Sequence, residues 1–289
     1  VRLRAEVYLD RKLVAYDIIG ESPFDADITE AVQPGKEQCL AVRVTNPGGN
    51  FHWQDFNEMY WGKYQIPPGR SFGGIIGRVR LDAVSPVYVS DIYMQNQPER
   101  TKVKAILTVN NTSAKTEKQD IYFSVYEKEN PGKVILEKKL PRVALKQGTN
   151  VVTMELHCPE ARIWDLDTPY LYVCGVDVKS GKKLSDRAVQ TFGFRWFEPV
   201  GIGKDAMLRL NGRRVMLRTA ISWGYWPATG LYATPEMAEK QVSVAKSMGL
   251  NMLNFHRSIG SPVVLEKADE LGLLYYEEPG AFHSAGHDP

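Results

Sequence analysis

The spacing of apolar residues changes once along this chain of 289 residues, and that change limits the folds open to it. Up to about residue 192, short runs alternate apolar and polar residues between turn residues, which predicts strands without helices. From Gly193 onward, strand-like and helix-like runs alternate, which is typical of parallel βαβ units. We therefore expect several domains, with all-β domains first and an α/β domain last.

The first domain, residues 1–85, has the pattern of a β-sandwich. Residues 5–9 and 40–44 alternate as strands do, and a turn is expected at residues 10–12. Residues 51–72 are rich in aromatic side chains, for which we favour packing over binding. We expect a jelly-roll-like sandwich that lacks its first strands.

The second domain, residues 86–192, is predicted to be an immunoglobulin-like sandwich. Strand-like runs at residues 103–109 and 121–126 lie among turn signals, and about 100 residues suits this fold. The turns are expected at residues 110–111, 130–132, 147–148 and 180–181. We expect this domain to be a platform for the others and not a binding site.

The third domain, residues 193–289, is expected to alternate strands and helices. A hairpin is predicted around Asn211-Gly212, a pair that type I′ turns prefer. A helix is predicted after Thr234 as N-cap, ending at Gly249, and a second helix spans residues 262–271, before Gly272. Strands are expected after the hairpin up to about residue 220, at residues 251–255 and at residues 273–276.

Such units build either an open sheet or a closed (β/α)8 barrel. A TIM barrel needs typically ~250 residues, so the residues after Gly193 can form only its first strands and helices. We therefore expect the chain to be a piece of a longer protein.

Composition excludes several classes of partner. The chain is 43% hydrophobic and 24% charged with a net charge of +2, and no basic or acidic block favours nucleic acid or a membrane surface. Three widely spaced cysteines favour buried free thiols over disulfides or a metal site, and we expect neither a metal nor a cofactor. The sequence has no signal segment, so the compartment stays open, and a periplasmic or extracellular location is compatible with it. A homo-oligomer is compatible with the sequence as well.

Short motifs along the chain resemble those of glycoside hydrolase family 2, the β-galactosidase, β-glucuronidase and β-mannosidase type. They occur in the family's order and cover nearly the whole chain: residues 22–29 (SPFDADIT), 73–79 (GGIIGRV), 167–172 (DTPYLY), 193–195 (GFR), 210–218 (LNGRRVMLR) and 268–274 (ADELGLL). The resemblance implies hydrolysis of O-glycosyl bonds of β-linked sugars with retention, β-galactosidase-like, by two Glu residues that act as acid/base and nucleophile. In the family these follow the fourth and seventh barrel strands, so we expect both beyond Pro289 and the fragment to be inactive.

The sequence departs from the family at the second barrel strand. Where the family has Asn, two residues, Arg, two residues and His, this chain has Asn251, Asn254 and Arg257. The departure indicates a divergent branch and leaves the sugar open.

Binding residues are expected at the carboxyl ends of the strands, where TIM barrels have their active sites. The candidates are Ser222, Trp223, Trp226, Asn254, Arg257, Glu277 and Glu278. Aromatic rings suit the apolar faces of sugars, whereas amide, guanidinium and carboxylate groups suit their hydroxyls. Each candidate also has a structural interpretation, as rim packing or an ion pair, and Glu277 and Glu278 point to opposite faces of their strand.

A second hypothesis belongs to another class of protein. Two β-sandwiches with a short α/β tail could be a non-catalytic carbohydrate-binding or adhesion array. The strand–helix units after Gly193 favour the hydrolase, because an array has no use for a parallel sheet with unpaired edges.

Overall fold

The computed structural model describes residues 4–18, 23–45, 60–61, 64–65, 74–75, 77–222, 233–256 and 259–278. The protein is mostly β, with several sheets and, among these residues, two helices. The backbone divides into two compact units, one holding the described residues up to Leu81 and the other those from Asp82 onward. The division into domains 1–85, 86–192 and 193–289 stays a prediction.

The first unit contains a three-stranded antiparallel sheet in the order β2-β1-β3. The central strand buries Ala5, Val7 and Leu9, as its alternation predicts, and it also buries Glu6, which pairs with Arg4. Residues Asp10 and Arg11 form the first turn, with φ of 47° and 69°. The strands are β1 (Arg4–Leu9), β2 (Lys12–Asp17) and β3 (Leu40–Thr45), and a short pair, β4 (Tyr60–Trp61) and β5 (Tyr64–Gln65), lies within the aromatic segment. The rest of that segment lies outside the described residues, and the jelly-roll stays a prediction.

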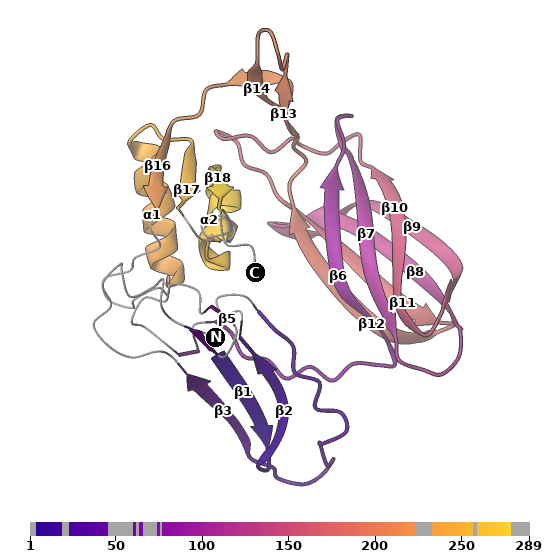
Figure 1. Ribbon diagram of the computed structural model, residues 1–289. Coiled ribbons are helices and arrows are strands. Elements are labelled where there is room, and N and C mark those ends of the chain that lie inside the picture. Colours follow the sequence, from indigo (N-terminus) through magenta and orange to yellow (C-terminus); the bar gives the residue numbers. More distant parts are fainter. Residues whose placement is uncertain are drawn as a thin grey trace. The chain divides into compact units, whose positions relative to one another are not determined.

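The second unit begins with a sandwich of two antiparallel sheets (Figure 1). One sheet has the order β10-β7-β6, and the other has the order β12-β11-β8-β9. Their strands are β6 (Val87–Asn96), β7 (Lys102–Asn111), β8 (Glu117–Glu127), β9 (Asn130–Leu145), β10 (Gly148–His157), β11 (Tyr172–Ser180) and β12 (Lys183–Phe192). Alternate residues of both sheets meet in one core, in which Leu107, Phe123 and Val176 are at most 2% exposed.

A hydrogen bond fixes the entry to β11. The hydroxyl of Tyr172, a residue that is 1% exposed, accepts a hydrogen bond from the backbone N–H of Arg162 at 2.8 Å. The ring packs edge-on against Phe194, with centroids 5.2 Å apart. A buried tyrosine at this point of the chain holds the loop before β11 against the core, as in the tyrosine corner of immunoglobulin-like domains.

One predicted turn is wrong. The chain turns at Lys128 and Glu129, whereas residues 130–132 already belong to β9. Pro131 lacks a backbone N–H and usually ends a strand, but β9 is the edge of its sheet, where a missing donor costs little.

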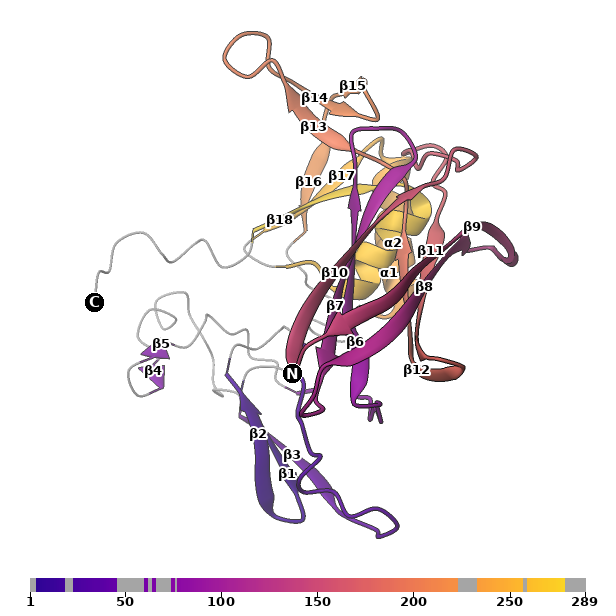
Figure 2. The ribbon, with the colours of Figure 1, turned by 90° about the vertical axis from the view of Figure 1, so that its right-hand side faces the viewer.

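A small antiparallel sheet, β13-β14-β15, follows the sandwich (Figure 2). Its strands are β13 (Phe197–Val200), β14 (Met207–Leu210) and β15 (Arg213–Val215). Asn211 and Gly212 join the last two, with φ of 53° and 79°. Positive φ at both positions is the type I′ geometry, so the predicted hairpin is confirmed.

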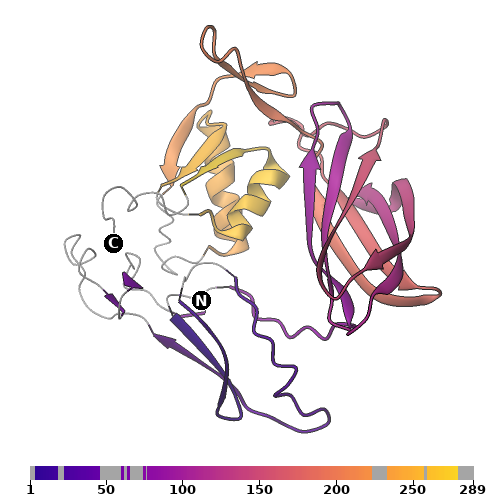
Figure 3. The same cartoon turned by 45° about the vertical axis from the view of Figure 1, so that its right-hand side comes forward.

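The chain then forms the predicted strand–helix units (Figure 3). They are β16 (Thr219–Ser222), α1 (Pro235–Ser247), β17 (Met252–Phe255), α2 (Pro262–Leu271) and β18 (Leu274–Glu277). The strands are parallel and neighbour one another in chain order, β16-β17-β18. Because βαβ crossovers are right-handed, two successive crossovers in one direction place both helices on the same face of the sheet.

The ends of both helices follow the sequence signals. The hydroxyl of Thr234 accepts a hydrogen bond from the N–H of Met237 at 3.3 Å, which is the expected N-cap. Gly272 ends α2 in the left-handed conformation. Both helices are therefore confirmed, and neither is long and apolar enough to cross a membrane.

Trp164 joins the sandwich to the strand–helix units. Its side chain is fully buried, and its indole N–H donates a hydrogen bond to the carbonyl of Asp269 in α2 at 2.7 Å. The guanidinium of Arg195 lies 4.3 Å from the centre of the ring and also pairs with the Asp269 carboxylate at 2.9 Å. Apolar side chains of Leu171 and Leu210 complete this cluster.

Two lysines reinforce the same contact. The ammonium of Lys246 donates to the carbonyls of Leu166 and Gly272 at 2.6 Å and 3.1 Å, and burial lowers its pKa. Because Gly272 follows α2, this cation lies at the negative end of the helix dipole. Lys128, from the sandwich, donates to the carboxylate of Glu270 at 2.6 Å.

We predict that Gly272→Ala destabilises the protein more than Gly249→Ala does. Both glycines have positive φ, 80° and 79°, so alanine costs each about 1 kcal/mol of backbone strain. At Gly249 an added Cβ meets nothing within 4 Å, whereas at Gly272 it collides with the carbonyl oxygen of Leu166. Urea unfolding of the two variants measures the difference, and equal losses would show that the contact with Leu166 imposes no constraint.

The cysteines are free, but the expectation that all three are buried is wrong. Cys158 and Cys174 lie in the sandwich core, whereas Cys39 is exposed, because it lies in the loop just before β3. Burial raises the pKa of Cys158 to about 11 and that of Cys174 to about 12. Thiolates at these two positions are therefore scarce at neutral pH.

We predict that an aromatic disulfide reagent at pH 8 labels Cys39 rapidly and the other two cysteines only after unfolding. Titration in the absence and presence of urea counts the reactive thiols, and Cys39→Ser is the control that removes the fast phase. Rapid labelling of two or more thiols in the native Cys39→Ser protein would contradict the burial of Cys158 and Cys174.

Candidate functional site

The carboxyl edge of the parallel sheet carries two rows of side chains that point in opposite directions. Ser222, Phe255 and Glu277 are in register across β16, β17 and β18. Ile221, Asn254 and Tyr276 form the row one residue earlier. Residues in register share a face of a sheet and successive residues alternate, so the rows lie on different faces.

The row of Ser222 faces the helices. Phe255 is 3% exposed and Ser222 is 6% exposed. The Ser222 hydroxyl accepts a hydrogen bond from the side-chain amide of Gln241 in α1 at 3.0 Å. The carboxylate of Glu277 accepts one from the backbone N–H of Gly260 at 3.0 Å, just before α2. Ser222 and Glu277 therefore hold the helical layer and its connecting segment in place.

The row of Asn254 lies on the opposite face, which we call the open face. Ile221 and Tyr276 are 53% and 54% exposed, so the described residues leave this face uncovered. The amide oxygen of Asn254 is buried and accepts no hydrogen bond from the described residues. A buried polar atom of this kind usually has a partner, so Asn254 is the candidate best placed to bind a further group.

A histidine and a carboxylate meet at the same edge. His256 and Glu278 each follow the end of a strand, β17 and β18, and Nδ1 of the imidazole lies 3.2 Å from a carboxylate oxygen. Both side chains are partly exposed, and the pair is ionic when the imidazole is protonated. His256 is not among the predicted binding residues, although its place one residue after a strand, like that of Glu278, is a signal that the two can meet.

The structure places four of the seven predicted binding residues at this edge, with Asn254 on the open face, Ser222 and Glu277 on the helical face, and Glu278 just beyond β18. The remaining three, Trp223, Trp226 and Arg257, lie outside the described residues. Within the part of the chain that is described, no three His, Cys, Asp or Glu side chains gather in a way that could hold a metal ion. The assignment of all seven to substrate binding stays a prediction.

What this edge can do chemically follows from its groups. Amide and carboxylate oxygens accept hydrogen bonds, and a protonated imidazole donates them, which suits a ligand rich in hydroxyls. The carboxylate of Glu277 accepts a hydrogen bond from a backbone amide, and that of Glu278 pairs with His256. This edge therefore carries hydrogen-bonding groups of the kinds that suit a polar ligand.

Comparison with known proteins identifies relatives over nearly the whole chain. Residues 87–195 match the family described as glycosyl hydrolases family 2. The chain is 28% identical to a β-galactosidase of Thermoanaerobacterium thermosulfurigenes, covering 96% of this chain and 37% of that protein. It is 23% identical to a β-glucuronidase of Formosa agariphila, covering 95% of this chain and 29% of that protein.

Solved structures also match nearly the whole of this chain and about a third of their own length. A glycosyl hydrolase family 2 member from Bacteroides cellulosilyticus superposes with a TM-score of 0.79 at 24% identity, over 96% of this chain and 36% of that one. The β-glucuronidase of Parabacteroides merdae superposes with a TM-score of 0.75 at 24% identity, over 96% of this chain and 34% of that one. The chain thus shares the fold of these proteins and spans about a third of their length.

We predict unequal effects on stability for two of the site residues. Ser222→Ala leaves the partly buried side-chain amide of Gln241 without its partner and should lower the free energy of unfolding by about 1 kcal/mol. Asn254→Ala removes an oxygen that makes no hydrogen bond and should change stability by less than about 0.5 kcal/mol. Chemical denaturation of both variants tests this, and a large loss for Asn254→Ala would mean that its amide already serves the fold.

Proposed function

This chain is a relative of glycoside hydrolase family 2, related to β-galactosidases and β-glucuronidases, and from that premise we propose that its parent protein is a retaining β-glycosidase. The substrate is a β-linked sugar, and the reaction is hydrolysis of the glycosidic bond, β-galactosidase-like. The chain supplies the domains that precede the catalytic pair together with the first part of the catalytic domain.

The parallel sheet carries this proposal. Three neighbouring parallel strands in chain order, with helices on one face, are how a (β/α)8 barrel begins. The open face is then the future barrel interior, which accounts for the exposure of Ile221 and Tyr276 in this chain. Strands β16 and β18 are both edges of the sheet here, and the remaining barrel strands would pair with them.

The two β domains support the same proposal. Seven strands in two sheets, with a tyrosine corner at Tyr172, suit an immunoglobulin-like domain in the middle of the chain. The three-stranded sheet of the first unit fits part of a jelly-roll-like sandwich. The contact of Trp164 with α2 would fix the middle domain to the barrel wall.

In the proposed enzyme, the edge residues of this chain bind and orient the sugar. Asn254 contributes its enclosed and unbonded amide oxygen, and Glu278 with His256 contributes a polar pair just beyond the strand ends. Two further glutamates, on strands beyond Pro289, act as acid/base and nucleophile at the separation of about 5–5.5 Å that retention requires.

The competing proposal, a carbohydrate-binding or adhesion array without catalysis, has less support. It accounts for the sandwiches but gives no role to the parallel sheet. Unpaired strand edges and an exposed apolar face tend to associate with other chains when they are left uncovered. The hydrolase proposal accounts for both.

Activity assays of two proteins test the proposed function. We expect the 289-residue chain to release no aryl alcohol from aryl β-glycosides, and the product of the complete reading frame to cleave one of them with retention. A panel of β-galactoside, β-glucuronide and β-mannoside identifies the sugar, and proton NMR of the first product gives the anomer. Turnover by the 289-residue chain would disprove the absence of the catalytic pair, and an inactive complete protein with a folded barrel would favour the array.

A further inference from the structure

The outer face of the sheet β12-β11-β8-β9 contains a groove that the proposed reaction does not use. Ser124 of β8 and Gly175 of β11 are paired across the sheet, and Val189 and Glu137 continue this row on β12 and β9. The two central positions of the row carry the shortest side chains. They form the floor of a groove of about 520 Å³.

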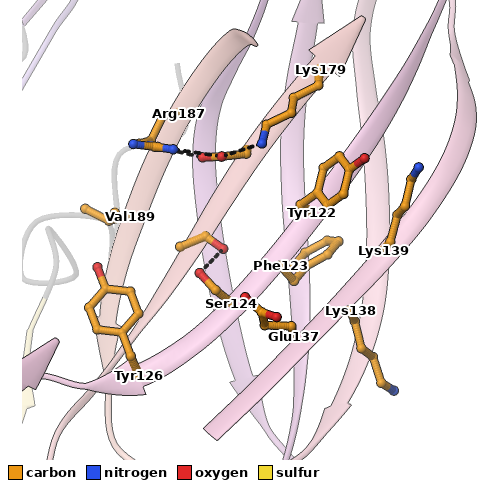
Figure 4. A pocket seen from close by; sticks show the side chains of 12 residues that line it. Tyr122, Phe123, Ser124, Tyr126, Glu137, Lys138, Lys139, Lys179, Arg187 and Val189 are labelled. Atoms are coloured by element: carbon orange, nitrogen blue, oxygen red, sulfur yellow. Dashed lines mark hydrogen bonds and ion pairs between the residues drawn. The ribbon is translucent and has the colours of Figure 1, made fainter. Parts of the chain in front are cut away.

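Longer side chains stand on both sides of this floor. Tyr122, Asp177 and Arg187 form the next row on one side, and Tyr126 stands on the other. Figure 4 shows Ser124 between Tyr122 and Tyr126 along β8. Because same-face residues recur every second position, the two tyrosines are about 14 Å apart along the strand, which leaves room for a sugar ring between them.

Gly175 keeps the floor low. An added Cβ would lie 2.7 Å from the Ser124 hydroxyl oxygen and 3.5 Å from the ring of Tyr126, so any other residue would fill the groove. Glycine weakens a strand interior and often marks a place where a ligand approaches the backbone closely. Its φ is not in the left-handed region, so space and not backbone strain distinguishes this position.

The groove carries more positive than negative charge. Its lining includes four cations, Lys138, Lys139, Lys179 and Arg187, and two carboxylates, Glu137 and Asp177. A third carboxylate next to the groove, that of Asp120, pairs with Lys139 at 2.6 Å. Arg187 binds Asp177 through two hydrogen bonds of 2.6 Å and 2.8 Å, and Lys179 lies 3.2 Å from the same carboxylate. These contacts hold the pKa of Asp177 below its usual range, against the effect of burial.

Two of the cations are held beside the ring of Tyr122, whereas Lys138 donates to the carbonyl of Glu155 at 3.0 Å. Lys139 and Lys179 lie 4.9 Å and 4.8 Å from the centre of the Tyr122 ring. Figure 4 shows Arg187 and Lys179 converging on one carboxylate at the rim. Ordered cations beside a hydroxyl floor and an aromatic wall match a ligand that bears both hydroxyls and carboxylates.

We propose that this groove is a non-catalytic binding site for an acidic oligosaccharide, one whose sugar rings carry carboxylates. The proposal rests on the proposed function for its choice of carbohydrate over other polyanions. The ring face of one sugar packs on Tyr126, its hydroxyls bind the Ser124 hydroxyl, and its carboxylate pairs with Lys139 or Arg187. Its role is to hold a polymeric substrate on the enzyme away from the catalytic barrel.

Calorimetric titration of the 289-residue chain with a short oligogalacturonate tests the site, since the site lies wholly within this chain. The neutral oligosaccharide of the same length, free galacturonate and a short polyglutamate are the comparison ligands. We expect the oligogalacturonate to bind at least about tenfold more tightly than the neutral sugar, and its affinity to fall as salt rises. Equal binding of polyglutamate would mean a general attraction to polyanions and would overturn the proposal.

Variants locate the binding. Gly175→Val fills the floor and should lower affinity about tenfold or more, and Lys139→Ala should lower it about threefold to tenfold. Lys146→Ala, an exposed lysine outside the groove lining, is the matched control and should bind as the unaltered chain does. Arg187→Ala is the second groove variant in case Gly175→Val fails to fold, which circular dichroism shows.

The two proposals fail separately. Affinity that is unchanged in Lys139→Ala and Arg187→Ala would overturn the groove while leaving glycoside hydrolysis by the complete protein untouched. Binding that depends on these residues, in a complete protein that hydrolyses no glycoside, would keep the groove and reject the hydrolase.

Discussion

The buried indole of Trp164 is the contact on which the arrangement of the second unit depends. It reaches from the loop before β11 to the carbonyl of Asp269, while Arg195 covers its ring and pairs with the same aspartate. Lys246 and Gly272 add a second contact at the end of α2, where only a residue without a side chain fits against Leu166. The strand–helix units thus depend on the sandwich for part of their burial, because their two helices cover only one face of the three-stranded sheet.

That one-sided burial decides which residues are available at the carboxyl edge. Ser222 and Glu277 point toward the helical layer, and their polar atoms are engaged by Gln241 and Gly260. Asn254 points to the uncovered face, with its amide oxygen enclosed and unbonded. An unbonded buried oxygen is costly in a finished protein, so its presence beside exposed Ile221 and Tyr276 is consistent with a sheet that is completed by further chain.

The sandwich has an apolar inner face and an outer face with the charged and aromatic side chains of the groove. Its inner face is built from the expected alternation of apolar residues, which the sequence displays directly. On the outer face, residues 50 and more positions apart come together, such as Ser124 with Gly175 and Tyr122 with Asp177. No local sequence pattern predicts which of these residues are neighbours, because that depends on the register between strands. The groove therefore could not be anticipated, although Gly175 inside a β-branched strand was a visible irregularity.

The sequence predicts most of the elements and their order, apart from the turn expected at residues 130–132, because these follow from local physics. The alternation in β1, the Asn211-Gly212 turn, the Thr234 cap and the Gly272 stop each act over a few residues, and each was predicted correctly. Position at a strand end also identified the edge at which Asn254 and Glu278 lie. Only the tertiary structure decided which face each side chain occupies, that Cys39 is exposed and that His256 meets Glu278. These outcomes depend on register and on packing between segments far apart in the chain, whose energies no short stretch of sequence contains.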